Sequence, residues 1–286
     1  MKSTTMLRKL IERPQGVVAP GAYDGLGAKL VEQAGFEAAY ASGGAIARST
    51  GIPDLGLLSL AEITQRLETM VDAIEIPLIA DADTGYGNAL NAQRTARAFE
   101  RTGVAGLHLE DQQFPKRCGH YEDKSIVPTL EMVQKLRAVR DALSDDDFLV
   151  IARTDGLAVE GYERTIERSH KYMEAGADVI FVEAPTSIEQ IEAIARDLPY
   201  TKLINMFKGG KTPFMAADRL AELGYRIIIV PSDLQRAAIK AMQNALAAIR
   251  SGDENHVAYE SMVSFKEREV LVGTVEFLER EARYAS

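Results

Sequence analysis

The sequence predicts a (β/α)8 barrel from two observations, which a weak repeat supports. Short apolar segments of the kind that form buried strands occur eight times along the 286 residues. Longer segments with helical spacing, such as 92–101 and 162–174, lie between them. This alternation favours parallel strands joined by right-handed crossovers, and eight such strands close a barrel. The predicted strands are 17–20, 38–42, 77–81, 106–110, 148–153, 179–183, 203–205 and 227–231.

The repeat places a glycine ahead of four strands, where it would end the preceding helix in a left-handed conformation. These glycines are Gly35, Gly103, Gly176 and Gly224. Because no low-complexity tract or linker interrupts the pattern, we expect one barrel domain over residues 1–286. Its last part, from about residue 253 to 286, reads as a charged helical extension. This extension is either a surface helix or an element that packs on a neighbouring subunit.

Composition and charge exclude several classes of function. The net charge of −9 and the pI near 5.1 leave no basic face to displace counterions, which argues against nucleic-acid binding. The N-terminus lacks the apolar stretch of a signal peptide, and no segment approaches the roughly 20 apolar residues that span a bilayer. The single cysteine excludes an internal disulfide and fits a reducing compartment. We therefore expect a cytoplasmic protein without nucleic-acid or membrane partners.

Polar residues end the predicted strands, and in this architecture those ends form the rim of the active site. Any one of these residues could be a solvated strand end or a helix cap. Together they would be costly to bury unless they were paired or bound a cation. The residues are Ser42, Asp81, Asp83, Glu110, Arg153, Glu183 and Asn205.

Asp81 and Asp83 are the most specific part of this pattern. Alternate residues of a strand point the same way, so the two carboxylates would face one point, with Glu110 of the next strand nearby. Oxygen ligands without a His or Cys cluster suit Mg²⁺ or Mn²⁺ rather than zinc. The alternative interpretation is an ordinary acidic loop end.

The only cysteine, Cys118, lies among Lys116, Arg117 and His120. Such an electropositive setting lowers the pKa of a thiol and favours the reactive thiolate. A lone cysteine is more often an inert buried residue, so its position among the polar motifs carries the functional interpretation.

Taken together, these residues resemble the isocitrate lyase/phosphoenolpyruvate mutase superfamily. The match runs in order from residue 20 to about residue 236. The Lys-Arg-Cys-Gly-His segment further resembles the carbon–carbon bond-cleaving branch, which includes 2-methylisocitrate, 2,3-dimethylmalate and petal-death-type lyases. The matching motifs are Pro20-Gly21-Ala22-Tyr23-Asp24, Ser42-Gly43-Gly44, Pro53-Asp54-Leu55-Gly56, Asp81-Ala82-Asp83-Thr84-Gly85, Leu109-Glu110-Asp111-Gln112, Lys116-Arg117-Cys118-Gly119-His120, Ala152-Arg153-Thr154-Asp155, Val182-Glu183-Ala184 and Asn205-Met206.

The resemblance implies a Mg²⁺ ion, with Mn²⁺ as a substitute, held by Asp83 directly and by Asp54, Asp81 and Glu110 through water. It also implies a homotetramer in which the last helix is swapped between subunits. The implied substrate-binding residues are Tyr40, Ser42, Gly43, Gly44, Asp81, Gly119, Glu183, Asn205 and Arg236.

The implied substrate is a small carboxylate, a 2-hydroxy acid with a second carboxylate on the neighbouring carbon. Loss of the hydroxyl proton, aided by the metal, would let the carbon–carbon bond break in a retro-Claisen-like step. Arg153 and His120 would stabilise the charge that develops, and Cys118 would protonate the resulting carbanion. The base that starts the reaction stays open between Tyr40 and a metal-bound hydroxide.

Departures from the family pattern bear on the substrate. Phe265 stands where methylisocitrate lyases have an arginine, and Asp233 would disfavour a further carboxylate, whereas Arg236 resembles the tricarboxylate enzymes. We therefore favour a substituted malate. The competing interpretations are an oxaloacetate hydrolase, an oxaloacetate decarboxylase that would not need the thiol, and an inactive barrel that binds small acids.

Overall fold

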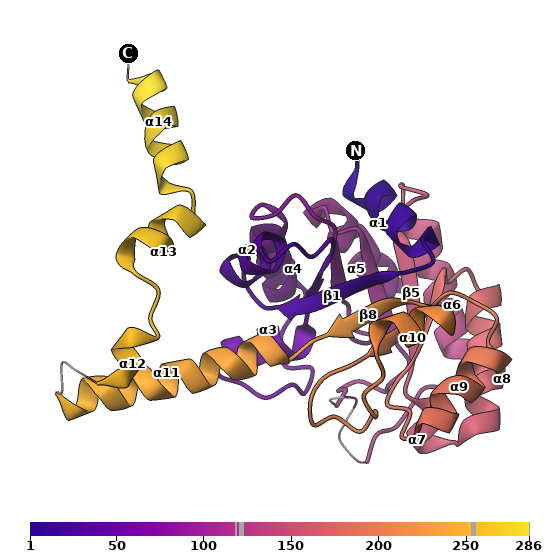
Figure 1. Ribbon diagram of the computed structural model, residues 1–286. Helices are drawn as coiled ribbons and strands as arrows, with labels where there is room; N and C mark the ends of the chain where they lie inside the picture. The colour runs from indigo at the N-terminus through magenta and orange to yellow at the C-terminus, as the bar shows by residue number, and fades with distance from the viewer. Residues whose placement is uncertain (118, 120–122, 253–255, 286) are drawn as a thin grey trace. The chain divides into compact units, whose positions relative to one another are not determined.

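Eight parallel strands close into a barrel in the order of the sequence (Figure 1). The computed structural model describes residues 1–117, 119, 123–252 and 256–285. All eight predicted strands are present, so the predicted (β/α)8 fold is confirmed. The strands are β1 (Val17–Ala22), β2 (Ala39–Ala41), β3 (Leu78–Asp81), β4 (Gly106–Glu110), β5 (Leu149–Thr154), β6 (Val179–Val182), β7 (Lys202–Asn205) and β8 (Tyr225–Val230).

The chain divides into two compact units, Met1–Asp233 and Leu234–Ser286. In the first unit, helices surround the barrel (Figure 1). They are α1 (Ser3–Glu12), α2 (Gly25–Gln33), α3 (Gly43–Ser49), α4 (Leu60–Val71), α5 (Ala89–Thr102), α6 (Thr129–Ala142), α7 (Gly156–Val159), α8 (Tyr162–Glu174), α9 (Ile188–Asp197) and α10 (Ala217–Glu222).

The remaining helices are α11 (Asp233–Ser251), α12 (Val257–Glu260), α13 (Phe265–Leu271) and α14 (Thr274–Tyr284). The second unit begins at Leu234, whereas the sequence places the start of the extension at about residue 253. The earlier start adds α11 to this unit, a helix of 19 residues.

Two groups of buried apolar side chains result from the alternation of side chains along each strand. One group lies between the strands and the surrounding helices, and includes Phe99 and Leu136. The other fills the barrel and includes Tyr40, Ile79 and Phe181. The interior is therefore a packed core that supports the strand ends from below.

The predicted helix-ending glycines adopt the expected backbone conformation. Their φ angles are 85° at Gly35, 87° at Gly103, 103° at Gly176 and 82° at Gly224. Only glycine takes such values at no steric cost, so each position turns the chain from a helix towards the next strand.

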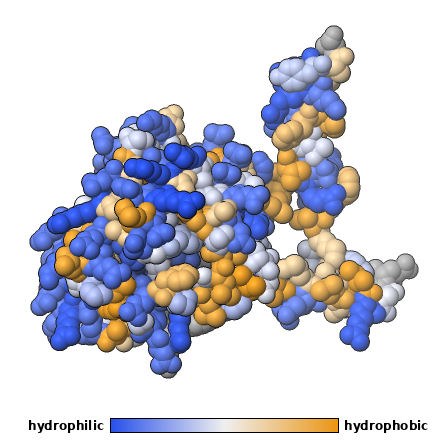
Figure 2. All heavy atoms as spheres, turned by 180° about the vertical axis from the view of Figure 1, so that it is seen from behind, coloured by the Kyte–Doolittle hydropathy of each residue, from blue (hydrophilic) through white to orange (hydrophobic). Residues whose placement is uncertain are grey.

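The surface of the first unit is largely hydrophilic, with scattered hydrophobic side chains, on the face shown in Figure 2. Among the described residues, no helix combines the length and the apolar character that crossing a membrane requires.

Phe99 and Leu90 lie on the same helix, α5, but only Phe99 is buried. Phe99 is 0% exposed and Leu90 is 74% exposed. We expect Phe99→Ala to lower the free energy of unfolding by about 3–5 kcal/mol, because it leaves a cavity in the core. Leu90→Ala should change it by less than about 0.5 kcal/mol. Urea unfolding followed by circular dichroism measures both, and equal effects would contradict this assignment of the core.

Candidate active site

The polar residues predicted at the strand ends converge on one end of the barrel. Four of them follow an interior apolar residue by two positions, so both side chains point into the barrel. Asp81, Glu110, Arg153, Glu183 and Asn205 are all buried, at 8% exposure or less. The interior residues two positions before four of them are Ile79, Ile151, Phe181 and Leu203.

Arg153 is the central cation of this rim. Its guanidinium group forms ion pairs with Asp155 at 3.0 Å, with Glu110 at 3.1 Å and with Glu183 at 3.5 Å. Burial disfavours the charged form of Arg153, but the three carboxylates outweigh it and hold its pKa well above the ordinary value. Arg153 therefore stays charged and is available to bind an anionic group.

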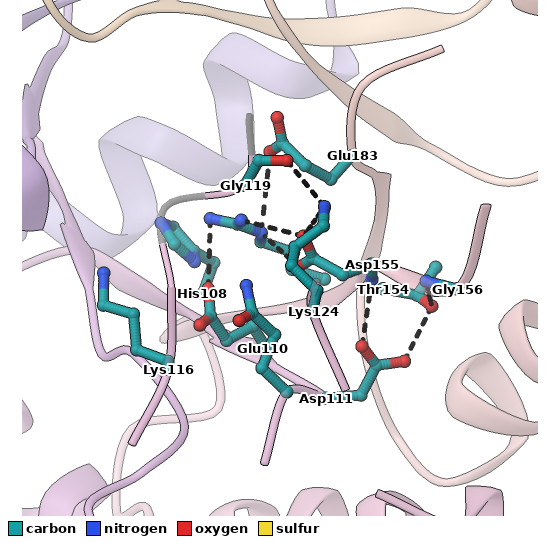
Figure 3. A network of polar contacts seen from close by, with 12 residues as sticks. His108, Glu110, Asp111, Lys116, Gly119, Lys124, Thr154, Asp155, Gly156 and Glu183 are labelled. Carbon is teal, nitrogen blue, oxygen red and sulfur yellow. Dashed lines mark hydrogen bonds and ion pairs between the residues drawn. The ribbon is translucent and has the colours of Figure 1, made fainter. Parts of the chain in front are cut away.

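Lys124 and Asp155 hold this arrangement in place, and the sequence analysis assigned a role to neither. Lys124 Nζ donates hydrogen bonds of 2.6 Å to Asp155 Oδ1 and to the carbonyl oxygen of Gly119 (Figure 3). Burial raises the pKa of Asp155, but Arg153 and Lys124 outweigh it and lower the pKa to about 2. Gly119 lies so close to Arg153 and Glu183 that a Cβ atom there would overlap both.

Asp111 forms a second set of hydrogen bonds, which holds Asp155 and its neighbours. The backbone N–H of Asp155 donates to Asp111 Oδ1 at 2.9 Å, and Asp111 Oδ2 accepts from the hydroxyls of Thr154 and Tyr172 at 2.7 and 2.8 Å. Tyr172 belongs to α8, so the network joins the end of β5 to the helix outside it. Asp111 was quoted in a family motif only, and its structural role depends on contacts between distant segments.

The acidic group on the other side of the rim contains Asp54, Asp81 and Asp83. The predicted reason for the proximity of Asp81 and Asp83, strand alternation, is wrong, because β3 ends at Asp81. Asp83 has a left-handed φ of 47°, and its N–H donates to Asp81 Oδ1 at 3.0 Å. A left-handed turn, uncommon for a non-glycine residue, thus places this carboxylate.

Lys116 forms ion pairs with Asp54 and with Asp83, the latter at 2.8 Å. This lysine is one of the three cations that the sequence analysis placed around the thiol. Its ammonium group is directed to these two carboxylates.

The residues proposed for the metal provide oxygen donors but do not form a ready site. Among the described residues, no three His, Cys, Asp or Glu side chains are grouped closely enough to hold a metal ion. Glu110 Oε1 is nevertheless buried and accepts no hydrogen bond from the described part of the chain. Burial raises the pKa of Glu110 well above its usual range, although Arg153 opposes this. A buried carboxylate oxygen without a donor fits a hydrated divalent cation, because Mg²⁺ retains several waters.

Tyr40 contacts His108, a residue that the sequence analysis missed. The Tyr40 hydroxyl lies 2.7 Å from His108 Nε2 and donates to Asp81 Oδ2 at 3.3 Å. Burial, followed by the charge of Asp81, raises the pKa of Tyr40 well above its usual value, so its phenol is neutral in this structure. Strand alternation offered a signal for His108, because it shares a face of β4 with Glu110.

Ser42, Gly43 and Gly44 lie where β2 turns into α3. The Ser42 hydroxyl accepts a hydrogen bond from the N–H of Ala45 and so caps this helix. A Cβ atom on Gly43 would come within 2.6 Å of Asp81 Oδ2, and one on Gly44 within 2.8 Å of Asp54 Oδ2. The two glycines therefore let both carboxylates lie against this turn.

Three predicted site residues are not placed at this rim by the structure. Cys118 and His120 lie outside the described residues. Arg236 lies in α11, within the second unit, and its contact with substrate stays a prediction.

The sequence of this chain is similar to that of a known protein family. A family described as phosphoenolpyruvate phosphomutase matches residues 7–250. The chain belongs to this family. The resemblance to the isocitrate lyase/phosphoenolpyruvate mutase superfamily is confirmed, and residues 20 to about 236, which carried it, fall within the match.

Two lyases are similar over nearly the whole chain. The 2,3-dimethylmalate lyase of Eubacterium barkeri is 41% identical over 287 residues, which cover 100% of this chain and 99% of the relative. The 2-methylisocitrate lyase of Aeropyrum pernix is 41% identical over 277 residues, which cover 97% of this chain and 89% of the relative. The prediction of an enzyme of the carbon–carbon lyase type is confirmed.

Two solved structures are similar in fold. An oxaloacetate acetylhydrolase in complex with 3,3-difluorooxalacetate gives a TM-score of 0.92 at 32% identity, covering 100% of this chain and 98% of the other. A phosphonopyruvate hydrolase in complex with oxalate and Mg²⁺ gives 0.90 at 30% identity, covering 100% of both chains. Lyases and hydrolases thus share this barrel.

Asp155→Asn tests whether Asp155 is the anion that stabilises the rim. At pH 7 we expect it to lower the free energy of unfolding by about 3–5 kcal/mol, because two buried cations lose a partner. The folded pKa of about 2 lies below the unfolded value, so this stabilisation is present at neutral pH and is lost as the pH falls towards 2.

The difference in the free energy of unfolding between wild type and Asp155→Asn should therefore become smaller below a pH of about 4, near the ordinary pKa of an aspartate. Chemical unfolding at several pH values measures it. Glu37→Gln, which removes an exposed ion pair with Arg13, is the control and should have little effect. A pH-independent deficit would show that the Asp155 charge is not responsible.

Proposed function

We propose that the protein is a Mg²⁺-dependent lyase that cleaves a 2-hydroxy dicarboxylate or tricarboxylate into a 2-keto acid and a second carboxylic acid. The observation that carries this proposal is the juxtaposition of two charged groups at one rim. Asp54 and Asp83 lie together around Lys116, and Arg153, held by Asp155, lies against Glu110. A substrate with a hydroxyl and two carboxylates presents groups for both.

The acidic side supplies the candidate metal ligands. We assign Asp83 as the direct ligand and Asp54, Asp81 and Glu110 as ligands through water, with Mg²⁺ as the ion and Mn²⁺ as a substitute. When bound, the cation would polarise the substrate hydroxyl and lower its pKa. Glu110 Oε1, which accepts no hydrogen bond from the described residues, supports the presence of a further cationic or hydrogen-bonding group here.

The basic side supplies binding and charge stabilisation. A general base takes the hydroxyl proton, the carbon–carbon bond breaks with formation of the keto group, and the electron pair passes to the departing carboxylate-bearing carbon. Arg153 would stabilise that charge, and Cys118 would donate a proton to the carbon. The buried position of Gly119, covalently linked to Cys118 and His120, supports assigning this segment to the site.

For the substrate, we favour a substituted malate over a tricarboxylate. The presence of Phe265 rather than an arginine, and of Asp233, supports this choice. Substrate contacts are assigned to Tyr40, Ser42, Gly43, Gly44, Asp81, Gly119, Glu183, Asn205 and Arg236.

Oxaloacetate hydrolysis is the second candidate. It is favoured by the similarity to the oxaloacetate acetylhydrolase structure. In that reaction water would attack the ketone of a shorter 2-keto acid, with the same acidic residues and Arg153 in place. For either reaction, we propose that the protein is located in the cytoplasm.

We further propose that the second unit mediates assembly into a homotetramer. No residue of α13 or α14 is buried among the described residues. Their apolar side chains include Phe265, Val275, Phe277 and Leu278, exposed by 73, 61, 62 and 57%. Figure 2 shows hydrophobic side chains along this part of the chain. Such exposure is typical of a surface that another subunit covers.

A Mg²⁺-dependent assay of 2-keto acid release distinguishes the candidate reactions. The compounds to compare are 2,3-dimethylmalate, 2-ethyl-3-methylmalate, 2-methylisocitrate, isocitrate and oxaloacetate. We expect 2,3-dimethylmalate or a close homologue to be cleaved with the highest kcat/KM. EDTA should abolish the activity, because the hydroxyl pKa is then no longer lowered. If no hydroxy acid is cleaved, oxalate formed from oxaloacetate would identify a hydrolase, and pyruvate formed from oxaloacetate would identify a decarboxylase.

Cys118→Ser serves as the mechanistic control in the same assay. A lyase that requires the thiol as proton donor should lose at least about 100-fold in kcat, the range of a general acid. A decarboxylase should be little affected. Full cleavage of a hydroxy acid by this variant would show that the thiol does not donate the proton.

Phe277→Glu combined with Leu278→Glu should dissociate the tetramer, because the two charges could not be buried between subunits. Light scattering coupled to size-exclusion chromatography measures the mass. Glu279→Gln with Glu281→Gln changes the charge of the same helix and should leave the mass unaltered. A monomeric wild-type protein would contradict the proposed assembly.

A further inference from the structure

Lys116 lies among the carboxylates to which the proposed function assigns a divalent cation. Its ammonium group forms ion pairs with Asp54 Oδ1 and, at 2.8 Å, with Asp83 Oδ1. Its side chain is only 4% exposed, so water does little to screen these pairs. In the view of Figure 3, Lys116 lies on one side of Glu110, and Lys124 and Asp155 lie on the other.

The ammonium group of Lys116 is held between two carboxylates in this position, those of Asp54 and Asp83. A buried cation with this many acidic neighbours neutralises part of their mutual repulsion.

A divalent cation on Asp83 would lie next to this ammonium group. The two positive charges would share the same buried carboxylate, and their repulsion would be large where water is excluded. Both cations cannot hold Asp83 in the arrangement described.

We propose that Lys116 is a built-in competitor of the divalent cation, and that it sets the affinity of the site for the metal. Its ammonium group holds Asp54 and Asp83 together in the metal-free protein and leaves them when the metal binds. The measured metal affinity then includes the loss of these ion pairs. This inference rests on the proposed metal site, but it assigns a separate role to Lys116.

Titration of the full-length protein with Mn²⁺, with free Mn²⁺ followed by electron paramagnetic resonance, tests this role. Lys116→Met should lower the dissociation constant by at least about tenfold, because the site loses its competitor and gains net negative charge. Lys116→Arg retains the charge and should bind Mn²⁺ no more tightly than wild type. Arg117→Met removes a charge from the next residue, which is half exposed, and should change the constant by less than about threefold.

Chemical labelling provides a measurement on the wild-type protein. Lysine acetylation by acetic anhydride, quantified by mass spectrometry, should modify Lys116 slowly without metal and several-fold faster at saturating Mn²⁺. Lys124 is the internal reference, because it is 2% exposed and pairs with Asp155 outside the acidic group. Its labelling rate should not change with Mn²⁺.

The results separate the inference from the proposed function. Equal or weaker Mn²⁺ binding by Lys116→Met, or unchanged Lys116 labelling on saturation, would overturn the competitor role and leave the metal site in place. Absence of Mn²⁺ binding by wild type and by Lys116→Met alike would overturn the proposed metal site itself.

Discussion

The buried ion pair between Arg153 and Asp155 is the interaction on which the arrangement of the rim depends. Asp155 accepts from Arg153 and from Lys124 while its own N–H donates to Asp111. Charges removed from water are tolerated only when each has a well-placed partner. A displacement of Asp155 would therefore take an ion-pair partner from two buried cations, Arg153 in β5 and Lys124.

This network also keeps the rim rigid. Asp111 links the end of β5 to Tyr172 on α8, and the apolar interior of the barrel supports the strand ends from below. Charged groups that are already oriented need not reorganise when charge develops on a substrate, which is the main electrostatic advantage of an enzyme site over water. The rim is suited to stabilising an anion for this reason.

Lyases and hydrolases share this scaffold, so the barrel does not choose the reaction. The acidic group and Arg153 suit any small acid with an oxygen next to a carboxylate. Discrimination must come from residues that contact the rest of the substrate.

Local pattern determined much of this protein. The eight strands, the helix-ending glycines and the polar residues at the strand ends follow from spacing along the chain, because alternation in strands and helix capping are local effects. The family motifs added candidate ligands such as Asp54, which lies outside any strand and has no periodic signal.

Only the tertiary structure decided how these charges are paired. Tyr40 and His108 are separated by 68 positions, Asp54 and Lys116 by 62, and Lys124 and Asp155 by 31. The first pairing depends on the closure of the barrel, which brings β2 and β4 to one interior, and the other two depend on where Lys116 and Lys124 lie. Residue spacing predicts which side of a strand faces inward. It does not predict which distant carboxylate a buried lysine pairs with, because the closed barrel as a whole determines that pairing.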